Sequence, residues 1–245
     1  MKQAEHPSGE VITFTEEDHK YIDTQGVVYT SVTGFIHNHF PEFDTEGVAK
    51  KYAAKRNLNV EDVKKDWEDK KNKGSEYGTR VHEFAEAKLL GNPLPDPSDE
   101  QDEKSFKTVG DFIDNDLLKN YRFIASEKII FSPRYRLAGT IDLLFKDKQG
   151  RLCVFDWKTN KEIKFGNTYQ CGNGFLKHLD DCNFNHYSLQ LNIYRRLLHE
   201  EGYFRGALDA NMAIFFVRRL PKMALQVYPV EKMDKEVDQM FSGCL

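Results

Sequence analysis

The sequence predicts a protein of the α/β or α+β class, in which strands and helices share one fold. Two patterns predict this class: short runs of β-branched and aromatic residues, and longer stretches whose apolar residues recur at helical spacing. The two kinds of segment mix along the chain and are not segregated into separate halves. With 40% hydrophobic and 13% aromatic residues, the 245-residue chain can fill a substantial core, so disorder over its whole length is excluded.

The first 73 residues predict a β-hairpin and helical extension ahead of a main domain at residues 74–245. Ser31 or Thr33 can cap a short helix that runs to Phe40, because Pro41 stops it. Strand-like runs precede this helix and two further helices follow it. The expected elements are strands at 11–15, 19–23 and 27–32, a helix at 46–56 capped by Thr45, and a basic helix at about 60–72 that Gly74-Ser75 breaks.

The main domain is expected to begin with a helix that ends at Gly91-Asn92-Pro93. The apolar stripe of this helix consists of Val81, Phe84, Ala85 and Leu89. From residue 122 onward the pattern changes to strands, and 159–184 predict a glycine-containing loop. The remaining expected elements are a helix at about 103–120, strands at 122–131, 135–145 and 151–158, a helix at 185–201, strands at 206–218 and 223–230, and a helix at 231–241.

Charge is distributed unevenly along the chain, whose net charge is -4. Residues 50–73 carry nine Lys and Arg against five acidic residues, whereas 96–116 carry eight acidic residues against two Lys. Two solvated helix faces would explain both stretches, and the alternative is that the basic stretch faces phosphate groups. The acidic total excludes a basic coat over the whole surface but leaves a local basic groove open.

The cysteines and the N-terminal sequence limit the class of protein further. The four cysteines, at 153, 171, 182 and 244, form no C-x-x-C pair, which disfavours a zinc ribbon and an iron–sulfur cluster. No run of about 18 apolar residues is present, so no transmembrane helix is predicted. The first ten residues lack the apolar core of a signal peptide. We therefore expect an intracellular, cytoplasmic protein with reduced thiols, neither secreted nor membrane-bound, and an organelle or the host cell of a virus is the alternative setting.

Residues 137–161 carry the most informative pattern, two strands that flank a turn at 148–150. A three-residue loop with Gly150 in the left-handed conformation places Asp147 opposite Arg151. In that register Asp142 lies opposite Asp156. Strand alternation then predicts one apolar face, made of Ile141, Leu143, Phe145, Cys153, Phe155 and Trp157, and an opposite face that bears Thr140, Asp142, Leu144, Val154, Asp156 and Lys158.

The two facing carboxylates predict a metal ion. Like charges directly across a ladder repel by a few tenths of a kcal/mol to about one. Lys158 compensates one negative charge, and a divalent cation is the simplest way to balance the remainder. Oxygen ligands favour Mg²⁺ or Mn²⁺ over thiophilic metals. An ion-paired, solvent-exposed sheet face is the alternative, although such faces seldom place Asp opposite Asp in so apolar a strand.

Two helical pairs are weaker candidates when each is taken alone. His82 and Glu86 lie four residues apart and share a helix face. A neutral imidazole can bind Mn²⁺ or Mg²⁺ beside carboxylates, and a following carboxylate can orient it, yet a surface pair is the more ordinary explanation. Gln190 and Tyr194 are also four apart, beside an apolar stripe, where they could simply form the edge of the core.

Together these residues resemble the PD-(D/E)xK nuclease superfamily, specifically its RecB-like nuclease branch. The matching motifs are Gly78-Thr79-x-x-His82-x-x-x-Glu86, Ala138-Gly139-Thr140-Ile141-Asp142, Asp156-Trp157-Lys158-Thr159 and Gln190-x-x-x-Tyr194, in this order, within about residues 74–200. The segment upstream of His82 is similar to phage-type and mitochondrial-type exonucleases of this branch. The resemblance implies an α/β fold with a restriction-endonuclease-like core, in which helices flank a central mixed β-sheet.

The resemblance also implies a role for each motif residue. His82, Asp142, Asp156 and the Trp157 carbonyl would bind the catalytic metal, with Glu86 as a further catalytic carboxylate. Lys158 would position or deprotonate the attacking water. Gln190, Tyr194 and Thr159 would organise the site or contact DNA. The implied cofactor is Mg²⁺ or Mn²⁺, with no iron–sulfur cluster, because the cysteines of cluster-containing members are not in place. Glu83, Glu86 and Glu127 could serve a second metal.

The resulting hypothesis is a metal-dependent DNA exonuclease that acts on ends or single strands in replication, recombination or repair. A structure-specific endonuclease and a non-catalytic DNA-binding module on the same fold are the alternatives. No helicase motif is present, so a helicase, recombinase or single-strand-binding partner would be a separate chain. Trp67, Tyr77 and Phe165 are candidates for stacking on unpaired bases, and each could equally be a core residue.

Overall fold

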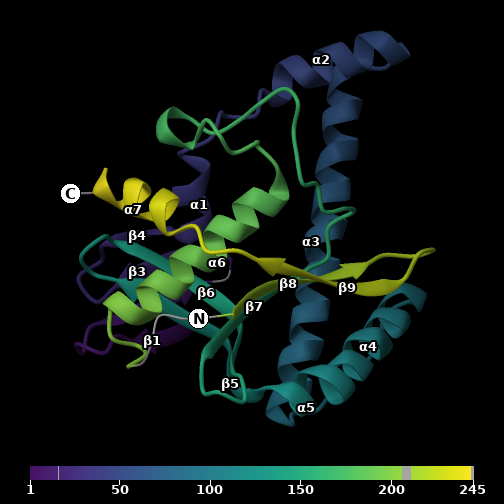
Figure 1. The fold of residues 1–245 in the computed structure, drawn as a ribbon. Helices are drawn as coiled ribbons and strands as arrows, with labels where there is room; N and C mark the ends of the chain where they lie inside the picture. Colours follow the sequence, from purple (N-terminus) through teal and green to yellow (C-terminus); the bar gives the residue numbers. More distant parts are fainter. Residues whose placement is uncertain (16, 206–210, 244–245) are drawn as a thin grey trace.

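The computed structural model describes residues 1–15, 17–205 and 211–243, and in this part of the chain the strands form one nine-stranded mixed sheet (Figure 1). The strand order is β1-β2-β3-β4-β6-β7-β8-β9, and β5 pairs with β6 outside this path. The strands are β1 Lys2–Glu5, β2 Val11–Thr15, β3 Lys20–Asp23, β4 Val28–Ser31, β5 Arg122–Ser132, β6 Leu137–Lys146, β7 Leu152–Lys158, β8 Asn211–Arg218 and β9 Ala224–Val230.

Helices cover both faces of the sheet. The helices are α1 Val32–His37, α2 Thr45–Arg56, α3 Val60–Leu90, α4 Glu100–Phe112, α5 Leu118–Asn120, α6 Asn183–Glu200 and α7 Asp234–Ser242, with a π-helical turn at Ile113–Leu117 and a 3₁₀ turn at Gly174–Leu176. One core cluster joins α1, α6 and α7 to the sheet, and a second joins α3 and α4 to the opposite face. Among the described residues, no helix combines the length and the apolar composition needed to cross a membrane.

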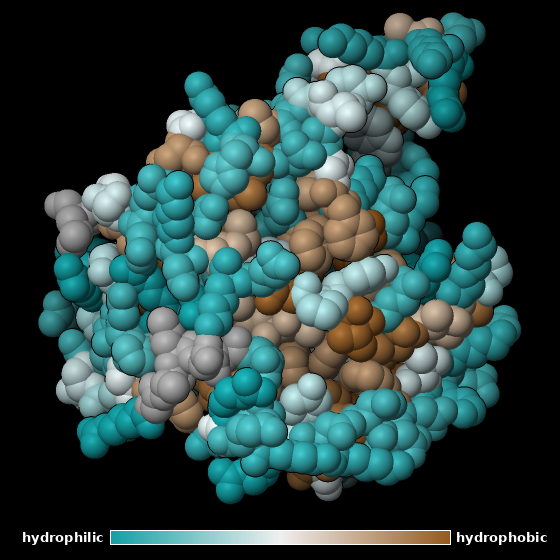
Figure 2. Space-filling view, in the orientation of Figure 1, coloured by the Kyte–Doolittle hydropathy of each residue, from teal (hydrophilic) through white to brown (hydrophobic). Residues whose placement is uncertain are grey.

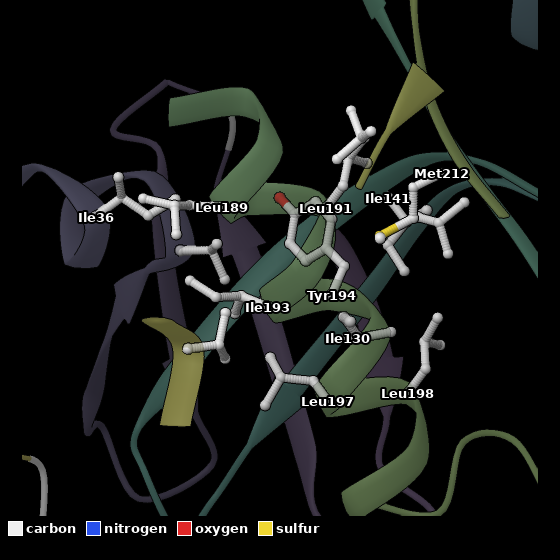
Figure 3. Close-up of a cluster of buried hydrophobic side chains, with 14 of the residues drawn as sticks. Ile36, Ile130, Ile141, Leu189, Leu191, Ile193, Tyr194, Leu197, Leu198 and Met212 are labelled. Carbon is white, nitrogen blue, oxygen red and sulfur yellow. The ribbon is translucent and has the colours of Figure 1, made fainter. Parts of the chain in front are cut away.

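Apolar side chains of α6 anchor it to the sheet, as Figure 3 shows for Leu189, Ile193 and Leu197 packed among Ile130 and Ile141. All five are almost completely buried. The helix predicted at 185–201 and its apolar stripe are thus confirmed. Since the apolar positions recur every three to four residues, one side of α6 is buried along most of its length.

The N-terminal strands follow the prediction closely, with one strand that the sequence analysis missed. The predicted runs correspond to β2, β3 and β4, and β1 pairs with β2 in addition. Ser31 caps α1 through the Gly34 amide, and α1 ends at His37, short of Phe40. The predicted cap of α2 was wrong by one residue, because the carboxylate of Asp44, and not Thr45, accepts the Gly47 amide.

The predicted break at Gly74-Ser75 was wrong, because α3 runs without interruption for 31 residues, or about 46 Å at 1.5 Å per residue. A helical glycine costs about 1 kcal/mol relative to alanine, which packing on both sides outweighs. Val63 is buried against α2, and Val81 is buried against the sheet. The division proposed between residues 73 and 74 therefore falls inside one helix, and Gly91 ends that helix with φ +70°.

The C-terminal half confirms the predicted order of strands and helices. The helix predicted at about 103–120 consists of α4, the π-helical turn and α5. The three strands after residue 122 correspond to β5, β6 and β7. The strand predicted at 206–218 is observed from Asn211, and its positions 206–210 lie outside the described residues. β9 and α7 complete the sheet and the second helical layer.

Strand β6 changes its partner along one edge, and we call the place between the two partner strands the fork of β6. The candidate site lies at this fork. β5 pairs with β6 along one edge, from Arg122↔Lys146 to Ser132↔Leu137. On the other edge, parallel β4 pairs with Leu137 and Ala138, whereas antiparallel β7 pairs with residues 143–146. The stretch 139–142 lies between the two partners. Side chains and not a neighbouring strand can therefore fill the space beside it.

Candidate metal-binding active site

The hairpin of β6 and β7 has the predicted register over the residues that pair. Leu143 lies opposite Phe155, Asp147 donates its amide to the Arg151 carbonyl at 2.9 Å, and Gly150 has φ +79°. Asp142 and Asp156 come next in this register. At this point the Trp157 amide donates to Oδ2 of Asp142 at 2.9 Å. The Asp142 carboxylate thus accepts the hydrogen bond of the Trp157 amide at the fork, where the backbone pairing of β6 with β7 ends.

The predicted apolar face was wrong at one position. Ile141 packs with Leu144 and Val154 on the α6 side, whereas Leu143 packs with Phe155 on the α3 side. The regular alternation of side chains between the two faces is lost at Asp142. Glu127 of β5 lies opposite Asp142, and its backbone has φ +46°. The left-handed backbone at a residue with a side chain is strained. This irregularity brings the carboxylates of Glu127 and Asp142 together.

His82 completes a group of three possible metal ligands with Glu127 and Asp142. One ligand atom from each residue lies within 4.8 Å of the other two. The His82 Nδ1 atom is 3.2 Å from Glu127 Oε1 and 3.6 Å from Asp142 Oδ2. α3 contributes the imidazole and two strands contribute the carboxylates. Residues far apart in sequence therefore meet where α3 crosses the fork.

Asp156 and Lys158 lie on the adjacent strand and form a buried ion pair. Lys158 Nζ is 2.5 Å from Asp156 Oδ2. Oδ1 of Asp156 has no hydrogen-bond partner among the described residues, and the residue is only 1% exposed. The Lys158 ammonium also lies 4.4 Å from the centre of the Tyr187 ring. The carboxylate is thus held in place with one oxygen left unpaired.

Burial and the charges of neighbouring residues shift the pKa values of the four ionisable groups in the cluster. Burial and the Asp142 charge raise the pKa of Asp156 to about 7. Burial also raises the pKa of Asp142, although His82 and Lys158 oppose it. Burial lowers the pKa of His82, but Asp142 and Glu127 outweigh it and raise that pKa to about 9. Similarly, Asp156 and Asp142 outweigh burial and raise the pKa of Lys158.

Gln190 and Tyr194 of α6 are buried, and Tyr194 lies near enough to Asp142 and Asp156 to be affected by their charges. Gln190 Nε2 donates to the Tyr194 hydroxyl at 3.0 Å. The Tyr194 ring lies so close to Gly139 that a Cβ there would be 2.6 Å from Cε1. Only glycine at position 139 permits this approach of α6 to β6. Burial keeps the pKa of Tyr194 well above its usual range, so the hydroxyl stays protonated.

Thr159 follows Lys158 and is held against α3. A Cβ at Gly78 would lie 3.0 Å from Thr159 Oγ1. Arg219 donates Nε to the Thr159 carbonyl at 2.8 Å and Nη2 to the Gly74 carbonyl at 3.3 Å. Both Gly78 and Gly74 belong to α3, the helix that carries His82. The end of β7 and the imidazole are thus fixed to the same helix.

The structure separates some of the predicted site residues from this cluster. Glu86 lies one turn after His82 but outside the three-residue ligand group. The Trp157 side chain is part of the core, and its backbone borders the site. Glu127, which the sequence indicated only as a second-metal candidate, is in contact with His82. Tyr187 was missed, although its spacing of three and seven residues from Gln190 and Tyr194 puts it on the same side of α6.

The residues present fit a hard divalent cation. Carboxylate oxygens together with one imidazole are ligands suited to Mg²⁺ or Mn²⁺. The unpaired Oδ1 of buried Asp156 is a polar atom that lacks a partner, which is costly unless a bound group supplies one. The positive φ of Glu127 is a local strain of the kind that accumulates at functional sites. The metal-free cluster therefore has the composition of a cation site.

Comparisons with known proteins identify the family of this chain. The model of the PD-(D/E)XK nuclease superfamily matches residues 100–243, which include Asp142, Asp156 and Lys158. No curated protein matches the chain. A solved structure from Eubacterium rectale, described as a "Putative exonuclease", is similar with 10% identity and a TM-score of 0.38, covering 88% of this chain and 77% of its own. Since the family model covers more than half of the sequence, the chain belongs to the PD-(D/E)XK nuclease superfamily.

Proposed function

We propose that this protein is a Mg²⁺- or Mn²⁺-dependent DNA exonuclease whose active site is the cluster at the fork of β6. The single observation that supports it most is the buried Asp156 carboxylate, which has one unpaired oxygen beside Lys158 and close to His82 and Asp142. A non-catalytic DNA-binding module would have no use for this arrangement, because carboxylates repel phosphate. We infer catalysis for that reason.

His82, Asp142, Asp156 and the Trp157 carbonyl would hold the metal, with Glu127 positioned to contact or orient His82. The chemistry that a divalent ion would supply there is the polarisation of a phosphate and a lower pKa for a water molecule. Lys158 lies beside these ligands, and its ammonium group would orient the attacking water and stabilise the charge that develops on the phosphate. Gln190 and Tyr194 hydrogen-bond to each other, and the Tyr194 ring packs against Gly139, three residues before Asp142, so they would help to fix this part of β6.

DNA as the substrate is supported by the basic arm, which we define as residues 45–73 of α2 and α3. Figure 1 shows α2 and the adjacent end of α3 standing out from the sheet. Several lysines of the arm have no ion pair in the part of the chain that the structure describes. These residues are Lys51, Lys55, Lys65, Lys71 and Lys73. Lysines that lack carboxylate partners are available to bind phosphate groups.

Digestion of end-labelled DNA tests the proposal. We expect cleavage of linear single-stranded or duplex DNA in Mg²⁺ or Mn²⁺ and none in EDTA. Asp142→Ala, Asp156→Ala and Lys158→Ala should each abolish cleavage while circular dichroism stays unchanged. The exonuclease mode follows from the resemblance of the motif set to exonucleases. Cleavage of covalently closed circles would favour the endonuclease alternative, and DNA binding without cleavage in any divalent metal would favour the accessory module.

A further inference from the structure

A row of aromatic side chains lies beside Lys158 and outside the cluster of proposed metal ligands. Phe165 contacts Phe184 of α6 at 4.7 Å and Tyr228 of β9 at 5.2 Å between ring centres. Tyr228 in turn lies 6.3 Å from Phe216 of β8. These four residues, called here the aromatic row, come from the loop after β7, from α6 and from the last two strands. The fold therefore assembles them from four separate segments.

The row begins next to the proposed catalytic lysine. Phe216 is the pairing partner of Lys158 in the parallel β7–β8 ladder. Phe184 lies one turn before Tyr187, whose ring is in contact with the Lys158 ammonium. Ile214 and Phe216 lie on the sheet face that α6 covers, because alternate residues of a strand share a face. The row thus extends this face outward from the active site.

The outer part of the row is open to solvent. Phe165 is 55% exposed, and Phe184 and Tyr228 are half-buried, whereas Phe216 is buried and forms the base of the row. Figure 2 shows hydrophobic side chains gathered over the region of β8 and β9, with hydrophilic side chains around them. Contiguous exposed aromatic surface beside an active site is typical of a binding surface.

Positive charge accompanies the row. Arg218 follows Phe216 on the same face of β8, two residues further along the strand. Neither Arg218 nor Lys161 has a carboxylate within 4.0 Å among the residues that the structure describes. Lys158 adds a third cation at the inner end. Rings accompanied by cations suit a single strand, because the rings can stack on its bases and the cations can pair with its phosphates.

We propose that the aromatic row binds the unpaired bases of single-stranded DNA, and that it makes single strands the substrate class of this nuclease. The inference rests on the proposed function. In a duplex the base faces are covered by stacking and pairing, so Phe165 and Tyr228 would have no face to contact. The cations and the continuity with Lys158 favour a nucleic-acid strand over a protein partner, because an apolar protein surface would not need them.

Fluorescence anisotropy with a labelled oligothymidylate tests the inference, with Ca²⁺ replacing Mg²⁺ to suppress cleavage. Phe165→Ala and Tyr228→Ala should each weaken binding by about 5- to 150-fold, the range that corresponds to the loss of one stacked base. Phe165→Leu keeps the apolar packing but removes the ring, and should weaken binding nearly as much as Phe165→Ala. Tyr169→Ala is the matched control, because Tyr169 is 93% exposed on the same loop and outside the row.

Several outcomes would overturn the inference. They are equal affinity of wild type and Phe165→Ala, an equal loss in Tyr169→Ala, and an equal loss for duplex DNA of the same length. Reduced self-association of Phe165→Ala in sedimentation, with unchanged DNA affinity, would instead assign the row to contact with a second copy. Because this binding test needs no catalysis, its outcome can be told apart from that of the proposed function, which fails if wild type cleaves no DNA in any divalent metal.

Discussion

At the scale of single residues, Asp156 holds a negative charge where its surroundings oppose it. It is 1% exposed, and burial together with Asp142 raises its pKa to about 7. The Lys158 ammonium compensates part of the cost of burying this carboxylate, but the raised pKa means that burial and the Asp142 charge outweigh this compensation. Functional sites commonly retain such unfavourable groups, because activity requires them. The stability of the metal-free protein should therefore improve when the charge is removed.

We predict that Asp156→Asn raises the free energy of unfolding in EDTA by roughly 1–3 kcal/mol, since it removes like-charge repulsion and the burial of a carboxylate. Thermal unfolding in EDTA measures this change. Addition of Mn²⁺ should raise the Tm of wild type and leave that of the variant almost unchanged. Asp147→Asn is the matched control on the same hairpin. Arg151 and nearby amides outweigh burial and lower the pKa of Asp147, so this variant should lose stability.

The stability of the metal-free protein should fall as the pH rises from about 4 to about 9. Between pH 4 and 7 the folded state binds a proton at Asp156 that the unfolded chain has released, because the pKa is raised to about 7. His82 is stabilised in its charged form, and this contribution disappears as the pH rises from 6.5 through its folded pKa of about 9. Urea titrations in EDTA at several pH values measure the trend. Stability that increased over this range would contradict both pKa shifts.

The sequence predicted the hairpin register that brings Asp142 near Asp156, because such a register depends on local turn chemistry, which Gly150 reveals. It did not identify the contact between Glu127 and His82. That contact depends on a left-handed residue in the middle of β5, and no residue type at position 127 signals such a conformation. A glycine would have done so, but the strained residue is a glutamate.

At the scale of elements, α3 links the basic arm to the site. Its first half packs on α2 and its second half carries His82. The low helix propensity of Gly74-Ser75 predicted two separate helices. The packing of α3 against α2 and against the sheet instead favours one continuous helix. The absence of a side chain at Gly74 leaves room for the Arg219 guanidinium, which lies 3.4 Å from where a Cβ would be. The sequence alone could not show this, as Arg219 is 145 positions further along.

The contact between α6 and β6 yields a prediction on packing. Gly139→Ala should destabilise the protein by about 1–3 kcal/mol, because the added methyl group would overlap the Tyr194 ring. Chemical denaturation measures the loss. Tyr194→Leu should restore part of it when combined with Gly139→Ala, because the smaller side chain leaves room for the methyl group. Additive effects of the two substitutions would show that the ring and position 139 are not coupled.

At the scale of the whole molecule, positive charge is concentrated on one projecting part of an acidic protein. The net charge is -4, while residues 50–73 carry an excess of four positive charges. Such a distribution attracts a polyanion to one region and repels it from the rest. The arm would thus guide DNA toward the fork of β6.

We expect Lys55→Glu, Lys71→Glu and Lys73→Glu together to weaken DNA binding and to lower its salt dependence. Each lost phosphate contact should reduce the slope of log K against log salt by about 0.7–0.9. Binding titrations at several salt concentrations measure both effects. Lys119→Glu and Lys148→Glu, which are exposed outside the arm, form the control. An equal weakening in the control would indicate a general charge effect and argue against a role for the arm.

The overall architecture was only partly predictable from the sequence. Element types followed from periodicity in most segments, because each element buries one face. The parallel pairing of β4 with β6 joins residues about 107 positions apart, so no local pattern could reveal it. The fork that results from this pairing leaves the stretch 139–142 free of a neighbouring strand on one edge. The family resemblance implied the candidate site residues, and the fork explains why His82, Glu127 and Asp142 lie close together.

The central claim is that His82, Asp142 and Asp156 hold a divalent ion beside Lys158 and that this site hydrolyses DNA. The most direct measurement is the cleavage rate of end-labelled single-stranded DNA by wild type and Asp156→Asn as Mg²⁺ is titrated from EDTA conditions to excess. We predict that wild type is inactive in EDTA and gains activity with Mg²⁺, and that the folded variant stays inactive at every concentration. Full Mg²⁺-dependent activity in Asp156→Asn would contradict the claim.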